Sequence, residues 1–391
     1  MEFKEFTKIY GISNQDISRE VYRNNQNTIR IKKEKVMQVI DKAGTIRPGE
    51  KIDPSAVKAF LQENIKGLTG DIVITQFPSG FSNLTYLIDM GGRQMVLRRP
   101  PIGARVKAGH DMGREYRILK AIHPVFPYCP KPLAFTEDTA IIGSPFFVME
   151  KLSGIILRKD LPKGLSFTRE QAENLCRALT NLQADIHTID VKKAGLDFIG
   201  KPAGYVQRQV EGWSNRYRKA RTEDAPDCEP IIAWLKDKMP KDTDRPAIVH
   251  NDYKLDNVVL DPGRPEKIIG VLDWEMATYG DPLMDLGNSL AYWVERNDPD
   301  DMQMMRTMPT NMAGAMTRQE ILDYYEKRTG RSTRKFDFYY CFGLFRLAVI
   351  AQQIYYRYFH KITNNKRFAL LIFAVIGLEK TALKVIESSD L

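Results

Sequence analysis

A short polar loop between two apolar runs constrains the fold of this chain more than any other feature. The sequence IVHNDYKLDNVVLD, residues 248–261, places Asp252 after one apolar run and Asn257 before another, VVL. A third apolar run, IIGVL, leads into Asp273 and can pair with VVL across a glycine-containing turn. The pattern therefore predicts a two-stranded ribbon beside which one Asn and two Asp side chains converge.

These three side chains suit magnesium binding and the activation of a hydroxyl group. Mg²⁺ prefers a few carboxylate or amide oxygens together with phosphate oxygens of a substrate. Asn257 and Asp273 can supply such oxygens, and Asp252 can accept a hydrogen bond from an attacking hydroxyl. We expect His250 to hold the loop through hydrogen bonds and to take no part in the chemistry.

The rest of the chain predicts an α+β fold with two lobes. Residues 1–50 form an N-terminal extension of unknown role, residues 51–150 a small strand-rich lobe, and residues 151–391 a larger, mostly helical lobe with a single β-hairpin. The strands expected in the small lobe are Asp71–Phe77, Leu84–Met90, Gln94–Arg98 and Phe146–Leu152. Such a layout places a small-molecule site in the cleft between the lobes.

Capping residues predict where several helices begin. Asp53, followed by a proline, predicts a helix start. Thr168, with a glutamine three residues later, forms a capping box before a long amphipathic helix that should run through Ile189. Asp281 precedes Pro282 as a helix cap, and Asp285 then falls in the first turn, where it could also brace the polar loop.

Composition narrows the class of partner. The formal net charge of +9 indicates an anionic partner, yet no dense Lys/Arg block with interleaved aromatic residues predicts a nucleic-acid surface. The four cysteines are widely spread without a CxxC pair, which suits a reducing compartment. The most apolar tracts, Phe342–Ile354 and Phe368–Leu378, are too short to span a bilayer. We therefore expect a cytoplasmic protein without a membrane partner.

Several ordered motifs resemble those of a kinase family. HNDYKLDN matches the catalytic-loop pattern HxDxxxxN, LDWE stands where protein kinases have DFG, and DPLMDL follows. In this order the motifs resemble the aminoglycoside and choline phosphotransferase-type kinases, which have a protein-kinase-like fold. Within that group, VLRRPP, REYRIL and FFVMEKLSG look most like the kinase-like domains associated with acyl-CoA dehydrogenases. The resemblance covers roughly residues 53–385.

The resemblance implies a role for each matching residue. Asp252 would be the catalytic base, and Asn257 and Asp273 would hold Mg²⁺ across the phosphates of ATP, or of GTP in its place. Arg98 stands where the family usually has a lysine, and Glu115 would pair with it. Arginine keeps the charge but binds phosphate differently. The remaining nucleotide contacts implied are a phosphate loop with Ser79, Gly80, Ser82 and Asn83, and a hinge at Met149, Glu150, Lys151 and Leu152.

The acceptor is less constrained than the donor. Aminoglycosides are polycations, and a chain with a net charge of +9 suits them poorly. The segment Arg98–Arg114 adds further cations, Arg99, Arg105, Lys107 and Arg114, as either a solvated loop or part of an anionic acceptor site. A hydroxyacyl-CoA or another anionic hydroxy compound is therefore the expected acceptor, with Arg357 as a candidate contact.

Three other functions compete with this interpretation. An aminoglycoside kinase is one. A catalytically silent nucleotide-binding module would explain the missing lysine, but it has no need of an intact Asp252, Asn257 and Asp273. A protein kinase is disfavoured because the chain passes from Asp273 to GDPLMDLG without an activation segment ending in APE. The sequence defines no oligomeric state.

Overall fold

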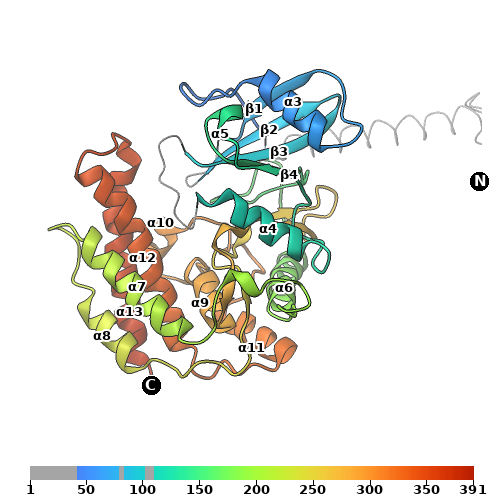
Figure 1. Cartoon of the computed structure of the whole chain (residues 1–391). Coiled ribbons are helices and arrows are strands. Elements are labelled where there is room, and N and C mark those ends of the chain that lie inside the picture. Colours follow the sequence, from blue (N-terminus) through green and yellow to red (C-terminus); the bar gives the residue numbers. More distant parts are fainter. Residues whose placement is uncertain (1–41, 79–82, 102–109) are drawn as a thin grey trace, which may run out of the picture.

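The computed structural model describes residues 42–78, 83–101 and 110–391, and it has two lobes (Figure 1). The N-lobe is built on a five-stranded antiparallel sheet with the order β1-β2-β3-β5-β4. Its strands are β1 (Ile72–Gln76), β2 (Leu84–Met90), β3 (Arg93–Arg99), β4 (Pro132–Thr136) and β5 (Phe146–Glu150). Helices α3 (Pro54–Asn64), α4 (Met112–Ile122) and α5 (Thr139–Ile142) complete it.

The N-lobe sheet separates two apolar cores because consecutive strand residues face opposite sides. Phe146 on β5 packs into the small core beneath α3, with Tyr86 from β2. Its neighbour Phe147 packs into the large core, which continues through α4 into the C-lobe. Figure 1 shows α4 between the sheet and the C-lobe. The sheet and the catalytic loop are therefore coupled through one continuous apolar core.

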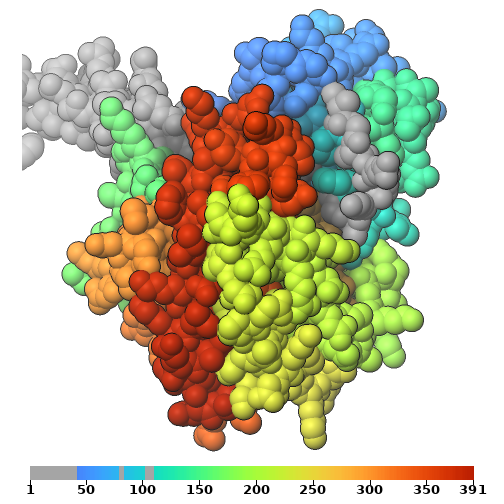
Figure 2. All heavy atoms as spheres, turned by 90° about the vertical axis from the view of Figure 1, so that its left-hand side faces the viewer, coloured from blue at the N-terminus to red at the C-terminus, as the bar shows by residue number. Residues whose placement is uncertain are grey.

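The C-lobe is mainly helical, as expected. Its helices are α6 (Arg169–Ile186), α7 (Tyr205–Ala220), α8 (Glu229–Asp237), α9 (Pro282–Ala291), α10 (Asp300–Met305), α11 (Arg318–Thr329), α12 (Asp337–Phe359) and α13 (Leu371–Ser388). Helices α7, α8, α12 and α13 form one face of this lobe, seen in yellow-green and red in Figure 2. No helix in the described part of the chain is long and apolar enough to cross a membrane.

Two helices that carry site residues pack backbone against backbone. A Cβ added at Gly287 on α9 would lie 2.3 Å from the carbonyl oxygen of Tyr339 on α12. A Cβ added at Gly343 on α12 would lie 2.3 Å from the carbonyl oxygen of Gly287. Only glycine permits this approach, which fixes α9 and α12 side by side, with Asp285 of α9 and Arg346 of α12 both bonded to Asn251 in the catalytic loop.

Two short ribbons hold the catalytic loop. β7 (Val258–Leu260) pairs with β8 (Ile268–Val271), as the sequence predicts. A second ribbon, which the sequence did not predict, pairs β6 (Ala247–Val249) with β9 (Thr278–Gly280). β4 and α5 were also missed. Asp53, Thr168 and Asp281 cap α3, α6 and α9 as predicted, although α6 ends at Ile186, three residues before the predicted end at Ile189.

Candidate active site

Asp252 and Asn257 are joined within the loop that connects β6 to the 3₁₀ turn η3 (Leu255–Asn257). The side-chain amide of Asn257 donates to the carboxylate Oδ2 of Asp252 at 2.7 Å and to its backbone oxygen at 2.8 Å. These bonds use the amide nitrogen, so the Asn257 amide oxygen is left for another partner. The predicted convergence of these two side chains is therefore present.

Lys254 is a site residue that the sequence analysis did not single out. Its ammonium group donates to both carboxylate oxygens of Asp252, each at 2.9 Å. The ammonium also lies 4.8 Å from the centroid of the Tyr292 ring. Burial lowers the pKa of Lys254, but Tyr292, Asp252 and Asp256 outweigh that effect and hold it above the ordinary value. Lys254 therefore stays positively charged against the candidate base.

Asp273 lies beside the same loop because the residue before it bonds to Asn257. The backbone N–H of Leu272 donates to the backbone oxygen of Asn257 at 2.8 Å. Asp273 itself has φ of 69°, a left-handed conformation unusual for a residue other than glycine. Burial raises its pKa, but the Arg98 guanidinium outweighs burial, so the pKa lies below its usual value. An ionised carboxylate and an amide oxygen are both donors that suit Mg²⁺, so the donor chemistry of Asn257 and Asp273 fits the ion.

Arg98 joins the two lobes through three carboxylates. Its guanidinium donates to Glu115 at 2.6 Å, to Asp273 at 2.9 Å and to Glu275 at 3.2 Å, while the residue is only 7% exposed. Burial raises the pKa of Glu115 to about 7 and that of Glu275 to about 8. The predicted pair with Glu115 is present, and the guanidinium fork serves a geometry that a lysine could not reproduce.

Glu275 and Arg114 fasten the lobes together. Glu275, from LDWE, accepts a hydrogen bond from Asn83 at 2.5 Å, and Asn83 bonds to His110 at 3.0 Å. Arg114 on α4 donates to the backbone oxygens of Glu275 at 2.8 Å and Ala277 at 2.5 Å. Ser79, Gly80 and Ser82 of the predicted phosphate loop lie outside the described residues.

The predicted hinge follows the last strand of the N-lobe sheet. Met149 is buried, whereas Glu150 is exposed at the end of β5. The backbone N–H and C=O groups of Lys151 and Leu152 bond to no other backbone group among the described residues. They are therefore free of the sheet and available to a ligand. The side chain of Leu152 packs over Gly270, where an added Cβ would lie 2.2 Å from Leu152 Cδ1.

A buried network braces the catalytic loop from below. Asp285 on α9 accepts from the backbone N–H of His250 at 3.2 Å and of Asn251 at 2.6 Å. His187 bonds to Asp285 at 3.0 Å and to Tyr325 at 2.8 Å. His250 Nε2 bonds to the backbone oxygen of Leu272 at 3.0 Å. The structural roles expected for Asp285 and His250 are thus present, and His187 belongs to the same network.

The structure gives different environments to the cationic residues that the sequence predicts near the acceptor. Arg99 donates to the backbone oxygen of Ile142 at 2.9 Å, and Arg114 binds the backbone oxygens described above, so both are engaged in the fold. Arg105 and Lys107 lie outside the described residues. Arg357 is exposed near the end of α12. It lies about 16 Å along the helix, by the usual rise per residue, from Arg346, which bonds to the catalytic loop at Asn251.

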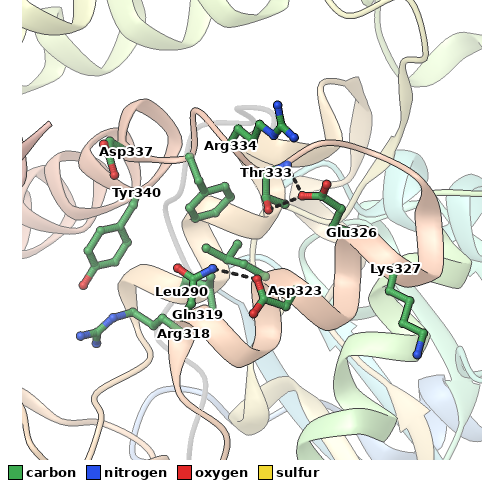
Figure 3. A pocket seen from close by; sticks show the side chains of 12 residues that line it. Leu290, Arg318, Gln319, Asp323, Glu326, Lys327, Thr333, Arg334, Asp337 and Tyr340 are labelled. Atoms are coloured by element: carbon green, nitrogen blue, oxygen red, sulfur yellow. Dashed lines mark hydrogen bonds between the residues drawn. The ribbon is translucent and has the colours of Figure 1, made fainter. Parts of the chain in front are cut away.

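A cavity of about 650 Å³ opens elsewhere, between α9, α11 and α12 (Figure 3). None of its lining residues belongs to the catalytic loop. The cavity is lined by both acidic and basic side chains, and two of the carboxylates already accept hydrogen bonds from nearby residues. Glu326 accepts from Thr333 at 2.8 Å, and Asp323 accepts from Gln319 at 2.8 Å. We assign the chemistry to the Asp252 site and not to this cavity.

The two lobes and the catalytic loop of the C-lobe define the class of fold, which is protein-kinase-like. The chain belongs to the Phosphotransferase enzyme family, whose sequence profile matches residues 73–326. It is 36% identical over 304 residues to acyl-CoA dehydrogenase family member 10 of Mus musculus, covering 76% of this chain and 28% of the relative. The chain spans less than half the length of the acyl-CoA dehydrogenase relatives it matches.

Solved structures support the same fold. A crystal structure from Ralstonia eutropha, provisionally named as an aminoglycoside phosphotransferase, matches with a TM-score of 0.74 and 29% identity, covering 87% of this chain and all of that one. An aminoglycoside phosphotransferase in a ternary complex with ADP and hygromycin B matches with a TM-score of 0.53 and 15% identity, covering 86% of this chain and 99% of that one. The second likeness shows the fold alone.

Proposed function

We propose that this protein transfers the γ-phosphoryl group of ATP, with Mg²⁺, to a hydroxyl of a small anionic molecule such as a hydroxyacyl-CoA or a hydroxy acid. The observation that carries the proposal is the joint placement of Asp252, Asn257 and Asp273, with Arg98 beside them. The related structure with bound ADP supports a nucleotide donor. The acyl-CoA dehydrogenase relatives favour an acceptor from acyl metabolism.

The residues of the chain suggest how the transfer would proceed. The acceptor oxygen forms a bond to the γ-phosphorus, the bond from that phosphorus to the bridging oxygen of ADP breaks, and Asp252 accepts the hydroxyl proton. Asn257 and Asp273 would hold Mg²⁺, which neutralises phosphate charge when bound. Arg98 holds Asp273 in place, and positioning with electrostatics supplies most of the rate gain.

A silent nucleotide-binding module remains the competing function, and one experiment separates the two. Purified protein is assayed for Mg²⁺-dependent ATP consumption with hydroxyacyl-CoAs, hydroxy acids, choline and aminoglycosides, beside an Asp252→Asn variant. We expect turnover with an anionic acceptor and its loss in the variant. Nucleotide binding without turnover on any acceptor would favour the silent module, and turnover with aminoglycosides alone would overturn the anionic acceptor.

A further inference from the structure

Arg346 is a nearly buried cation at the catalytic loop that has no acidic partner among the described residues. It lies on α12 and is 5% exposed. Its Nη2 donates to the backbone oxygen of Asn251 at 2.7 Å, one peptide unit from Asp252. No carboxylate among the described residues lies within ion-pair distance of it, and residues 79–82 and 102–109 contain no Asp or Glu. Buried arginines are usually paired, so this one is unusual.

A second arginine, Arg216, contacts the same tryptophan ring as Arg346. The guanidinium carbons of Arg216 on α7 and of Arg346 lie 4.6 Å and 5.0 Å from the centroid of the Trp213 ring. Arg216 is exposed, and no acidic partner is seen for it in the described part of the chain. Burial and the nearby charge of Arg346 lower the pKa of Arg216. Both guanidinium groups therefore contact one indole ring, near enough for the charge of Arg346 to act on Arg216, and a bound anion would relieve that repulsion.

The two arginines lie on helices α7 and α12, which belong to one side of the C-lobe. Figure 1 places α7 and α12 on the opposite side of the C-lobe from α6, which follows the predicted adenine hinge. The Lys254 ammonium, which is bonded to Asp252, lies 4.8 Å from the centroid of the Tyr292 ring. Burial raises the pKa of Tyr292, and the charges of Lys254 and Arg346 oppose that rise. A molecule with its hydroxyl at Asp252 would therefore extend toward Arg346. A polycationic acceptor would meet like charges there.

We propose that Arg216 and Arg346, gathered at Trp213, bind a carboxylate of the acceptor and so select hydroxy acids over uncharged or cationic alcohols. This assignment rests on the proposed function and selects the hydroxy acids from its two acceptor classes, because the thioester of a hydroxyacyl-CoA carries no free carboxylate. Arg346 has four N–H groups without a hydrogen-bond partner among the described residues, enough for a two-pronged contact with a carboxylate. Arg216, at the surface, would close the contact from outside.

Equilibrium binding of short- and medium-chain hydroxy acids and of their methyl esters tests the assignment, with ADP and Mg²⁺ present. Titrations would compare the natural protein with Arg216→Ala, Arg346→Gln and Lys219→Ala. The last removes a charge from the exposed face of the same helix and serves as the matched control. We expect at least one acid to bind more tightly than its ester. Arg346→Gln should weaken that acid about tenfold, the scale of a charge-assisted hydrogen bond.

The outcomes distinguish this assignment from the phosphotransferase proposal. Arg216→Ala should weaken binding of the acid less than Arg346→Gln does, and Lys219→Ala should leave it unchanged. The affinity for the methyl ester should be the same in all variants. Equal binding of acid and ester, no binding of any acid, or unchanged acid binding in both arginine variants would overturn the subsite while leaving ATP-dependent turnover to be judged separately. Arginine-dependent acid binding without ATP consumption would uphold the subsite and contradict the phosphotransferase.

Discussion

Lys254 holds both carboxylate oxygens of Asp252, each at 2.9 Å, from two residues further along the same loop. The contact fixes the rotamer of the candidate base and places a positive charge directly beside it. A network of Asp252, Asn257 and Lys254 is therefore positioned before any substrate arrives.

Replacing Lys254 tests this positioning. Lys254→Met keeps much of the side-chain length but removes the charge, so we expect kcat to fall about 10²-fold with little change in nucleotide affinity. Lys254→Arg should retain part of the rate because it keeps the charge. Steady-state kinetics with nucleotide titrations provide the measurement. Wild-type kcat in Lys254→Met would show that the ion pair is structural only.

Replacing Arg98 tests whether the arginine has become essential in place of the usual lysine. Arg98→Met leaves buried Glu115 and Glu275 without their cation, which should cost about 3 kcal/mol of unfolding free energy. Arg98→Lys should cost less but still weaken nucleotide binding, since one ammonium cannot reach three carboxylates. Urea unfolding and nucleotide titration check both variants. Arg93→Met, at the exposed start of the same strand, is the control and should behave as the natural protein.

A side chain placed in the close contact between α9 and α12 should lower the unfolding free energy of the protein. Gly287→Ala forces a methyl group against the Tyr339 carbonyl, and such overpacking costs about 1–3 kcal/mol. Gly212→Ala, inside α7, has only the end of a flexible side chain nearby at 3.5 Å. It should be neutral or slightly stabilising. Unfolding free energies of the two variants compare these effects directly, and equal values would contradict the close approach.

The buried His250 predicts how stability depends on pH. Burial lowers the pKa of its imidazole below the ordinary 6.5, so the folded protein keeps it neutral. The unfolded chain takes up a proton below pH 6.5 that the folded chain does not, so this contribution to stability is present above 6.5 and lost as the pH falls. His250→Gln should therefore show a shallower loss of unfolding free energy on acidification. His360→Gln, at an exposed position, should keep the wild-type slope.

The local motifs were readable from the sequence, whereas the contacts across the lobes were not. Asp252 and Asn257 lie five residues apart in one loop, so spacing alone brought them together. Glu275 bonds to Asn83 across 192 residues, Arg114 to the Glu275 backbone across 161, and Arg346 to Asn251 across 95. No local pattern encodes such pairs. Strand β4 was missed because it begins with proline and buries only one of its five residues.

The most direct test of the central claim is the ratio of kcat between the natural protein and Asp252→Asn, measured with Mg²⁺, ATP and the best anionic acceptor. Nucleotide affinity is measured on the same samples. Loss of a positioned general base typically removes about 10²–10⁴-fold of rate, and we predict a loss of that size with nucleotide affinity retained. A variant that turns over as fast as the natural protein would contradict the assignment of Asp252 and, with it, the account of this site as a phosphotransferase centre.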